Sequence, residues 1–130
     1  PPKIKVFLWQ LCHDRLPTSI NIVKRNGPAT GPCALCGVPE DADHVFFRCP
    51  LACFAWSTGC EATGVDWDPR SRSELVSSLS SVQGSYRRTM WTCAAAMLWA
   101  LWRTRNKFTI EGVFPSQPAG VIYKCIIFLQ

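Results

Sequence analysis

The sequence predicts an all-α fold in which one long, tryptophan-rich helix forms the spine of the C-terminal half. That helix is expected over residues 86–109, because residues 90–102 are apolar at every position except Thr92. A helix that is apolar on all sides is typical of a protein core, and these thirteen residues are too few to cross a bilayer, which needs about 20. The second observation is a series of shorter helical patterns separated by proline, glycine and asparagine, which mark helix ends.

Several shorter helices are expected around this spine. Residues 3–13 carry apolar residues at helical spacing, and Thr18 or Ser19 can cap a second helix that ends at residues 26–28. The remaining elements are expected as a short helix from about Asp43, a helix from Leu51 to Cys60 that Pro50 begins, a loop over 61–72, a helix from Ser73 to near Gly84, and a final apolar segment over 117–130. The pattern of this last segment suits either a helix or a strand.

Four side chains in the N-terminal half have the spacing of a metal site. Cys33, Cys36, His44 and Cys49 follow the pattern C-x2-C-x7-H-x4-C. Three thiolates and one imidazole form a ligand set that tetrahedral Zn²⁺ requires. Because four protein ligands leave no open position for a catalytic water, we predict one structural zinc ion. The zinc segment is expected as a hairpin-like knuckle, with or without one short two-stranded β-hairpin, that runs into the short helix from about Asp43.

Other interpretations of this cluster remain open at this point. The thiols can be unmetallated core cysteines beside a surface histidine, or Cys53 can replace His44 as a ligand, since it shares a helix face with Cys49. His13 is expected on a helix surface. The polar and acidic loop over residues 38–43 is expected to face solvent.

Composition bounds the organisation and excludes several classes of protein. At 130 residues, 48% apolar and 18% charged, the chain is too hydrophobic for disorder and long enough for one core. We expect a zinc-binding domain over residues 1–60 and a helical extension over 61–130 that packs on it as one compact unit. No signal peptide is visible, so the eight cysteines indicate an intracellular, reducing compartment, the nucleus or the cytoplasm or both.

The charge pattern permits contact with nucleic acid. The formal net charge is +5, with basic residues gathered in 1–25 and 87–107 and acidic residues in 40–68. Phe47 is assigned either to stacking on an unpaired base or to packing beside the metal, whereas Phe46 and Trp56 are expected to support the metal site. The cations nearest the knuckle are the predicted nucleic-acid contacts, against the alternative of ordinary solvated charge: Arg15, Lys24, Arg25 and Arg48.

Several motifs carry a resemblance to a known family. In order along the chain they are Pro2-Lys3-Ile4-Lys5-Val6-Phe7-Leu8-Trp9, Arg15-Leu16-Pro17-Thr18, Asn21-Ile22-Val23-Lys24-Arg25, the cysteine and histidine cluster, and Trp56. Over residues 2–56 the chain thereby resembles the reverse-transcriptase zinc-binding domain of plant LINE-type (non-LTR) retrotransposons and of gene-like copies derived from them. Residues 99–106 are similar to a W-x2-W-x2-R-N segment that follows this domain in the same polyproteins.

The resemblance implies that Cys33, Cys36, His44 and Cys49 are the metal ligands of an accessory module that handles nucleic acid. The catalytic aspartates of the polymerase have no match here, so we predict no enzymatic activity and no small-molecule substrate. No membrane insertion is predicted either, because the apolar run over residues 90–102 is too short to span a bilayer. The predicted partner is RNA or DNA. The alternative is a repurposed protein-interaction module whose apolar C-terminal segment, residues 121–129, docks on a host protein or on a second copy of the chain.

Overall fold

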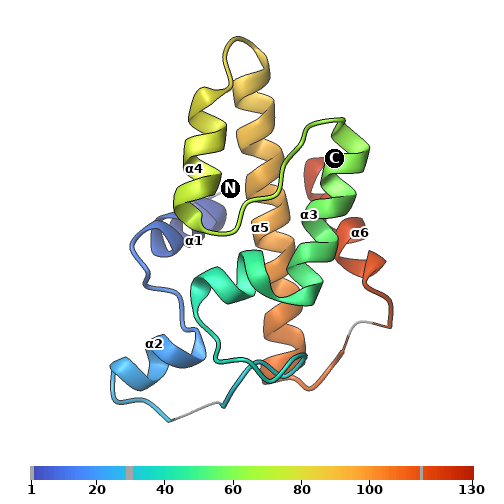
Figure 1. The fold of residues 1–130 in the computed structure, drawn as a ribbon. Coiled ribbons are helices and arrows are strands. Elements are labelled where there is room, and N and C mark those ends of the chain that lie inside the picture. The colour runs from blue at the N-terminus through green and yellow to red at the C-terminus, as the bar shows by residue number, and fades with distance from the viewer. Residues whose placement is uncertain (1, 29–30, 115) are drawn as a thin grey trace.

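The computed structural model describes residues 2–28, 31–114 and 116–130, and over these residues it contains helices and no strand (Figure 1). The elements are α1 (Pro2–Cys12), α2 (Ser19–Lys24), η1 (His44–Arg48), α3 (Pro50–Thr63), α4 (Arg72–Ser81), α5 (Tyr86–Ile110) and α6 (Ala119–Leu129). The all-α prediction is therefore confirmed, and the described part of the knuckle contains no β-hairpin. In the part of the chain that is described, no helix has the length and apolar character needed to cross a membrane.

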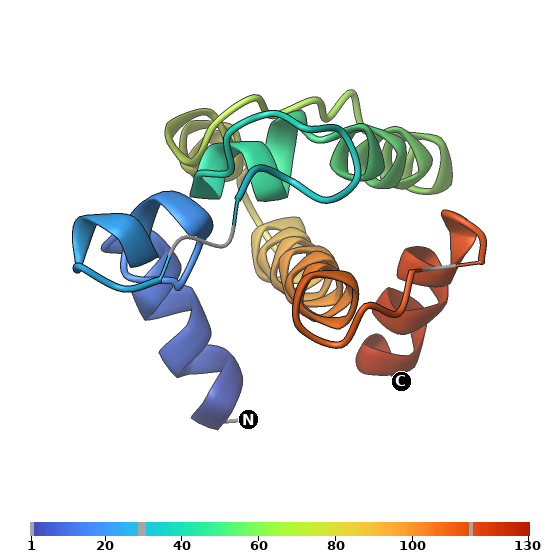
Figure 2. The ribbon, with the colours of Figure 1, turned by 90° about the horizontal axis from the view of Figure 1, so that it is seen from below.

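Helix α5 is the spine of the molecule, as its apolar sequence predicts. It contacts α1, η1, α3, α4 and α6. Figure 2 looks along α5 and shows α1 and α2 on one side, α6 on the other, and η1 with α3 across a third side. Alanines at positions 94, 96 and 100 are buried, and their small side chains let neighbouring helices approach closely. The helix is not covered all round, however, because the side chain of Trp91 is 38% exposed.

The final apolar segment is helical, which decides between the two predicted conformations. Val121 and Cys125 are buried, and their i, i+4 spacing places both on the face of α6 that packs against α5. The opposite face of α6 carries exposed apolar side chains.

Local signals mark the ends of the shorter helices. The Thr18 hydroxyl accepts a hydrogen bond from the backbone N–H of Asn21 at 3.4 Å, so Thr18 is the cap of α2. Pro50 occupies the first turn of α3, where its missing N–H has no cost. Helix α3 runs past the predicted Cys60 to Thr63 and ends at Gly64, whose φ of 70° suits a helix C-terminus. The loop that follows is correspondingly shorter than predicted.

Candidate metal centre

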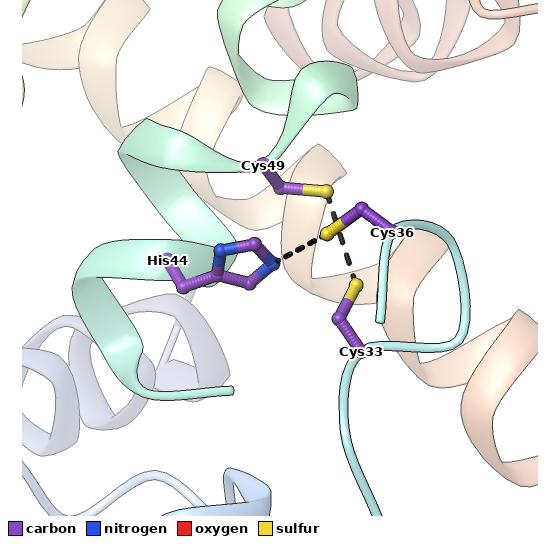
Figure 3. A group of neighbouring side chains, drawn as sticks. All are labelled: Cys33, Cys36, His44 and Cys49. Carbon is purple, nitrogen blue, oxygen red and sulfur yellow. Dashed lines mark hydrogen bonds between the residues drawn. The ribbon is translucent and has the colours of Figure 1, made fainter. Parts of the chain in front are cut away.

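The four side chains of the cysteine and histidine cluster converge on one point (Figure 3). Their ligand atoms all lie within 4.8 Å of one another, with 4.0 Å between the Sγ atoms of Cys33 and Cys49 and 3.3 Å between Cys36 Sγ and His44 Nε2. Tetrahedral zinc, with Zn–S bonds of about 2.3 Å, holds its sulfur ligands about 3.8 Å apart. The donor set and its spacing therefore fit one structural zinc ion.

A tight turn brings the first two thiols to the same side. The backbone N–H of Gly37 donates to the Cys33 carbonyl at 2.8 Å, and the N–H of Cys33 donates to the Val38 carbonyl at 2.9 Å. Gly37 has a φ of 75°, a left-handed conformation that costs glycine little and other residues more. The C-x2-C-G sequence therefore folds locally into a loop that presents both sulfurs.

The other two ligands stand at the two ends of a short helical turn. The Asp41 carboxylate accepts a hydrogen bond from the His44 N–H at 2.7 Å, and this bond caps the turn at its start. The Cys49 N–H donates to the His44 carbonyl at 2.8 Å, the wide i→i+5 pattern of a π-type turn. His44 and Cys49 are thereby joined by one backbone hydrogen bond, which fixes their separation.

Burial shifts the pKa values of two ligands, His44 and Cys49, in opposite directions. Burial lowers the pKa of His44, with a further contribution from Arg48, against the opposing effect of Asp41 and Glu40; the imidazole is thus kept neutral, the form that binds zinc. Burial, together with the neighbouring thiols of Cys33 and Cys36, raises the pKa of Cys49 to about 12. Zinc must therefore displace a proton from the Cys49 thiol as it binds.

Aromatic side chains pack beside this turn in the core. Phe46 and Trp56 are buried, as predicted, and the Trp56 indole N–H donates to the Phe46 carbonyl at 2.7 Å. Phe47 is only 1% exposed and stacks on Trp56 with ring centroids 6.1 Å apart. This burial leaves no ring face of Phe47 open to a base, so the structure corrects the base-stacking prediction and supports the packing alternative.

Glu40, between the two halves of the cluster, is buried, and the prediction of a solvent-facing loop is wrong at this residue. Its side chain is 2% exposed and forms a two-point ion pair with Arg105 of α5. Arg105 Nε donates to Oε2 at 3.1 Å, and a second guanidinium nitrogen donates to Oε1. The backbone N–H and the hydroxyl of Ser19 also donate to Oε1, at 3.1 and 3.2 Å. The metal loop is thus attached to α5 and to the start of α2.

Arg105 is the functional residue that sequence reasoning missed. Its basic neighbours suggest a solvated cation near a helix end, yet it is buried, and its guanidinium carbon lies 5.0 Å from the centroid of the Trp102 ring. Burial by itself raises the pKa of Glu40, but the hydrogen bonds and charge of Arg105, with the donors of Ser19, outweigh this effect and hold that pKa below the usual value for a glutamate. The carboxylate is therefore ionised at neutral pH and paired.

The rival ligand and the second histidine lie away from the cluster. Cys53 is directed at backbone carbonyls, with its Sγ 3.5 Å from the oxygen of Phe47 and 3.6 Å from that of Arg48. His13 is exposed just past the end of α1, as predicted for a surface residue. All eight cysteines are free of disulfides.

The predicted nucleic-acid contacts are exposed. Arg15 follows α1, and Lys24 and Arg25 stand at the end of α2. Arg48, on η1, lies 4.0 Å from Asp43 and keeps 55% of its side chain exposed. Their role in binding nucleic acid stays a prediction.

Comparison with protein families gives a match at this part of the chain. Residues 1–56 match the family described as zinc-binding in reverse transcriptase, and this segment contains all four converging side chains. Comparisons with curated proteins and with solved structures gave no match. The geometry of the cluster and the family match agree, and residues 1–56 are a zinc-binding domain of the reverse-transcriptase type.

Proposed function

We propose that the chain is a non-catalytic accessory module, derived from a reverse transcriptase, that binds RNA or DNA. The observation that carries the proposal is the set of exposed cations Arg15, Lys24 and Arg25, which lie just before α2 and at its end. None of the three takes part in an ion pair among the described residues. Exposed cations without carboxylate partners are free to neutralise phosphates, the main source of affinity for nucleic acid.

Hydrogen bonds join the two backbone segments that carry these cations. The buried Asn21 amide donates to the carbonyls of Asp14 and Leu16, at 3.1 and 2.9 Å, and to the Asp14 carboxylate at 3.1 Å. These bonds join α2 to the turn that carries Arg15. Lys24 lies three residues after Asn21 on α2, so their Cβ atoms are about 5–6 Å apart. The anchor at Asn21 therefore also positions the backbone that carries Lys24.

The zinc site supports this arrangement from the other side. Ser19, at the start of α2, binds the Glu40 carboxylate, which belongs to the loop between Cys36 and His44. Order in the metal loop therefore stabilises the position of α2 and its cations. The four-protein-ligand site leaves no metal position for a substrate, which supports a structural role for the zinc.

Binding to nucleic acid should weaken as salt rises and should depend on α2. Each phosphate contact contributes about −0.7 to the slope of log K against log salt for single strands and about −0.9 for duplexes. The double variant Lys24→Ala/Arg25→Ala is expected to bind more weakly to every sequence, with a slope shallower by about 1–2. Fluorescence anisotropy with labelled RNA and DNA over a range of salt concentrations measures both quantities.

The matched control is Arg87→Ala/Arg88→Ala, which removes the same charge from exposed positions at the start of α5. It should bind more tightly than the α2 variant. Equal losses in the two variants would show that only net charge matters, and an absence of salt-sensitive binding in the wild-type protein would reject the proposal.

The exposed face of α6 supports a second candidate function, self-association. Tyr123 and Ile127 are each 68% exposed, and Ile126 and Leu129 are also exposed. No charged side chain is among them, because Lys124 is directed at the Thr104 hydroxyl, 3.2 Å away. An apolar face without charge is complementary to itself, so we propose a second copy of the chain as its partner in a two-fold dimer.

Charge placed on this face should prevent self-association. The variant Ile126→Glu/Ile127→Glu is expected to remain a monomer at concentrations where the wild-type chain dimerises, because paired glutamates cannot be buried without partners. Light scattering over a range of protein concentrations measures the mass. Val113→Glu changes an exposed apolar residue outside α6 and should leave the dimer intact, whereas a wild-type chain that stays monomeric throughout would exclude this function.

A further inference from the structure

The outer face of α1 carries a large aromatic side chain that the core does not use. Helix α1 buries Ile4, Phe7 and Leu11 on its inner face. Trp9 lies on the opposite face with 52% of its surface exposed. Because half of the indole surface is open to solvent, Trp9 is accessible to a ligand.

Two polar side chains gather around the exposed indole. The His13 ring stacks on Trp9 with centroids 4.6 Å apart and an angle of 28° between the planes. The guanidinium carbon of Arg15 lies 5.7 Å from the centroid of the Trp9 ring, within cation–π distance. Aromatic and cationic groups are therefore combined at one exposed position.

Backbone structure holds this group together. The His13 Nδ1 lies 2.9 Å from the Trp9 carbonyl oxygen, and because a carbonyl only accepts, Nδ1 is the donor. After α1, the N–H of Asp14 bonds to the Leu11 carbonyl and the N–H of Arg15 bonds to the Gln10 carbonyl, while Asp14 adopts a left-handed φ of 52°. This is the Schellman arrangement, which reverses the chain and returns Arg15 toward the helix.

The charge around this group favours a phosphate backbone. Lys5 is exposed one helical turn before Trp9, on the same face of α1. Neither Lys5 nor Arg15 forms an ion pair in the described part of the chain. The nearby Asp14 carboxylate does not neutralise either cation through an ion pair in the described part of the chain; it accepts a hydrogen bond from the Asn21 amide instead. Two unneutralised cations therefore stand on either side of the indole.

We propose that Trp9, His13 and Arg15 form a stacking platform for an unpaired base, so that the ligand of this module is a single-stranded segment of RNA or DNA. The inference rests on the proposed nucleic-acid function and names its substrate class. Every base has a π-face, so stacking on an aromatic side chain tolerates any sequence. In a duplex these faces are already stacked on neighbouring base pairs, whereas Lys5 and Arg15 can contact the phosphates that flank a splayed base.

The test compares nucleic acids that differ only in their bases. Wild-type protein is titrated with a labelled oligothymidylate or oligouridylate, with the same strand carrying abasic residues at its centre, and with a duplex of equal length. We expect the intact single strands to bind most tightly. Trp9→Ala should lose about 5- to 100-fold in affinity for the intact strand and should no longer distinguish it from the abasic strand.

Two variants separate stacking from general effects. Trp91→Ala removes another partly exposed tryptophan, one that has no ring or cation partner among the described residues, and it should bind like the wild type. Trp9→Phe should retain the preference for intact over abasic strands. Zinc content and circular dichroism should be unchanged in all three variants, since neither tryptophan is fully buried.

The outcomes distinguish this inference from the proposed function. If the wild-type protein binds intact and abasic strands equally, or if Trp9→Ala binds like Trp91→Ala, the platform is rejected. Salt-sensitive binding that depends on Lys24 and Arg25 would then still support the nucleic-acid function. If no nucleic acid binds at any salt concentration, both are rejected.

Discussion

Replacing Cys36 with serine is expected to abolish stoichiometric zinc binding and to unfold the knuckle. Cys36 is the most exposed of the four converging side chains, so the substitution removes a ligand with little loss of core packing. Structural zinc contributes about 10–16 kcal/mol in small zinc-binding peptides, comparable to the entire stability of a typical domain, about 5–15 kcal/mol. The variant should therefore show a large fall in thermal stability together with loss of the metal.

Elemental analysis of the purified protein measures the zinc content, and thermal unfolding with and without a chelator measures its contribution. The chelator should destabilise the wild-type protein to the level of Cys36→Ser and should have no further effect on the variant. Cys53→Ser is the matched control, because the Cys53 thiol is directed at the carbonyls of Phe47 and Arg48. A Cys36→Ser protein with full zinc content and unchanged stability would show that the ligand assignment is wrong.

Replacing Arg105 with alanine is expected to destabilise the protein by about 3–5 kcal/mol, the cost of leaving the partner of a buried ion pair uncompensated. Arg105 is the sole cation bonded to the Glu40 carboxylate among the described residues. After its loss, Ser19 alone would stabilise a buried negative charge. Because Glu40 lies between Cys36 and His44, the affinity for zinc should fall as well.

Urea denaturation at neutral pH measures the change in the free energy of unfolding, and competition with a chromophoric chelator measures zinc affinity. Arg103→Ala, two residues earlier on α5 but exposed, should change neither. In a double-mutant cycle, Glu40→Gln/Arg105→Ala should be less destabilised than the sum of the two single variants. Strict additivity would contradict direct coupling between the two side chains.

The same ion pair bears on how the two parts of the chain depend on each other. The matched family segment ends at residue 56, yet the loop inside it is bonded to a residue of α5, sixty-five positions away from Glu40. Helix α5 also contacts α1, η1 and α3, and α3 extends across the predicted boundary after residue 60. The metal site is therefore supported by residues outside the segment that supplies its ligands.

Short-range signals are sufficient to predict the ligand set and the helical fold. The cysteine and histidine spacing predicts the ligands, and the proline and threonine at helix starts, with the apolar run of α5, predict the helices. Spacing along the chain determines which side chains a turn brings together, and helix capping is equally local. Burial is different. It depends on which distant helix covers a given position, so the sequence leaves Phe47 with both an exposed and a packed interpretation and does not indicate that Trp9 is exposed.

The pairing of Glu40 with Arg105 shows the same limit. Each residue alone resembles a solvated charge, and no local pattern connects positions so far apart in the chain. The sequence by itself determined the metal ligands and the helices, since their signals are short-range. Only the tertiary structure decided which charges are buried, which aromatic ring faces solvent and what attaches the metal loop to the core, because these follow from the packing of helices around α5.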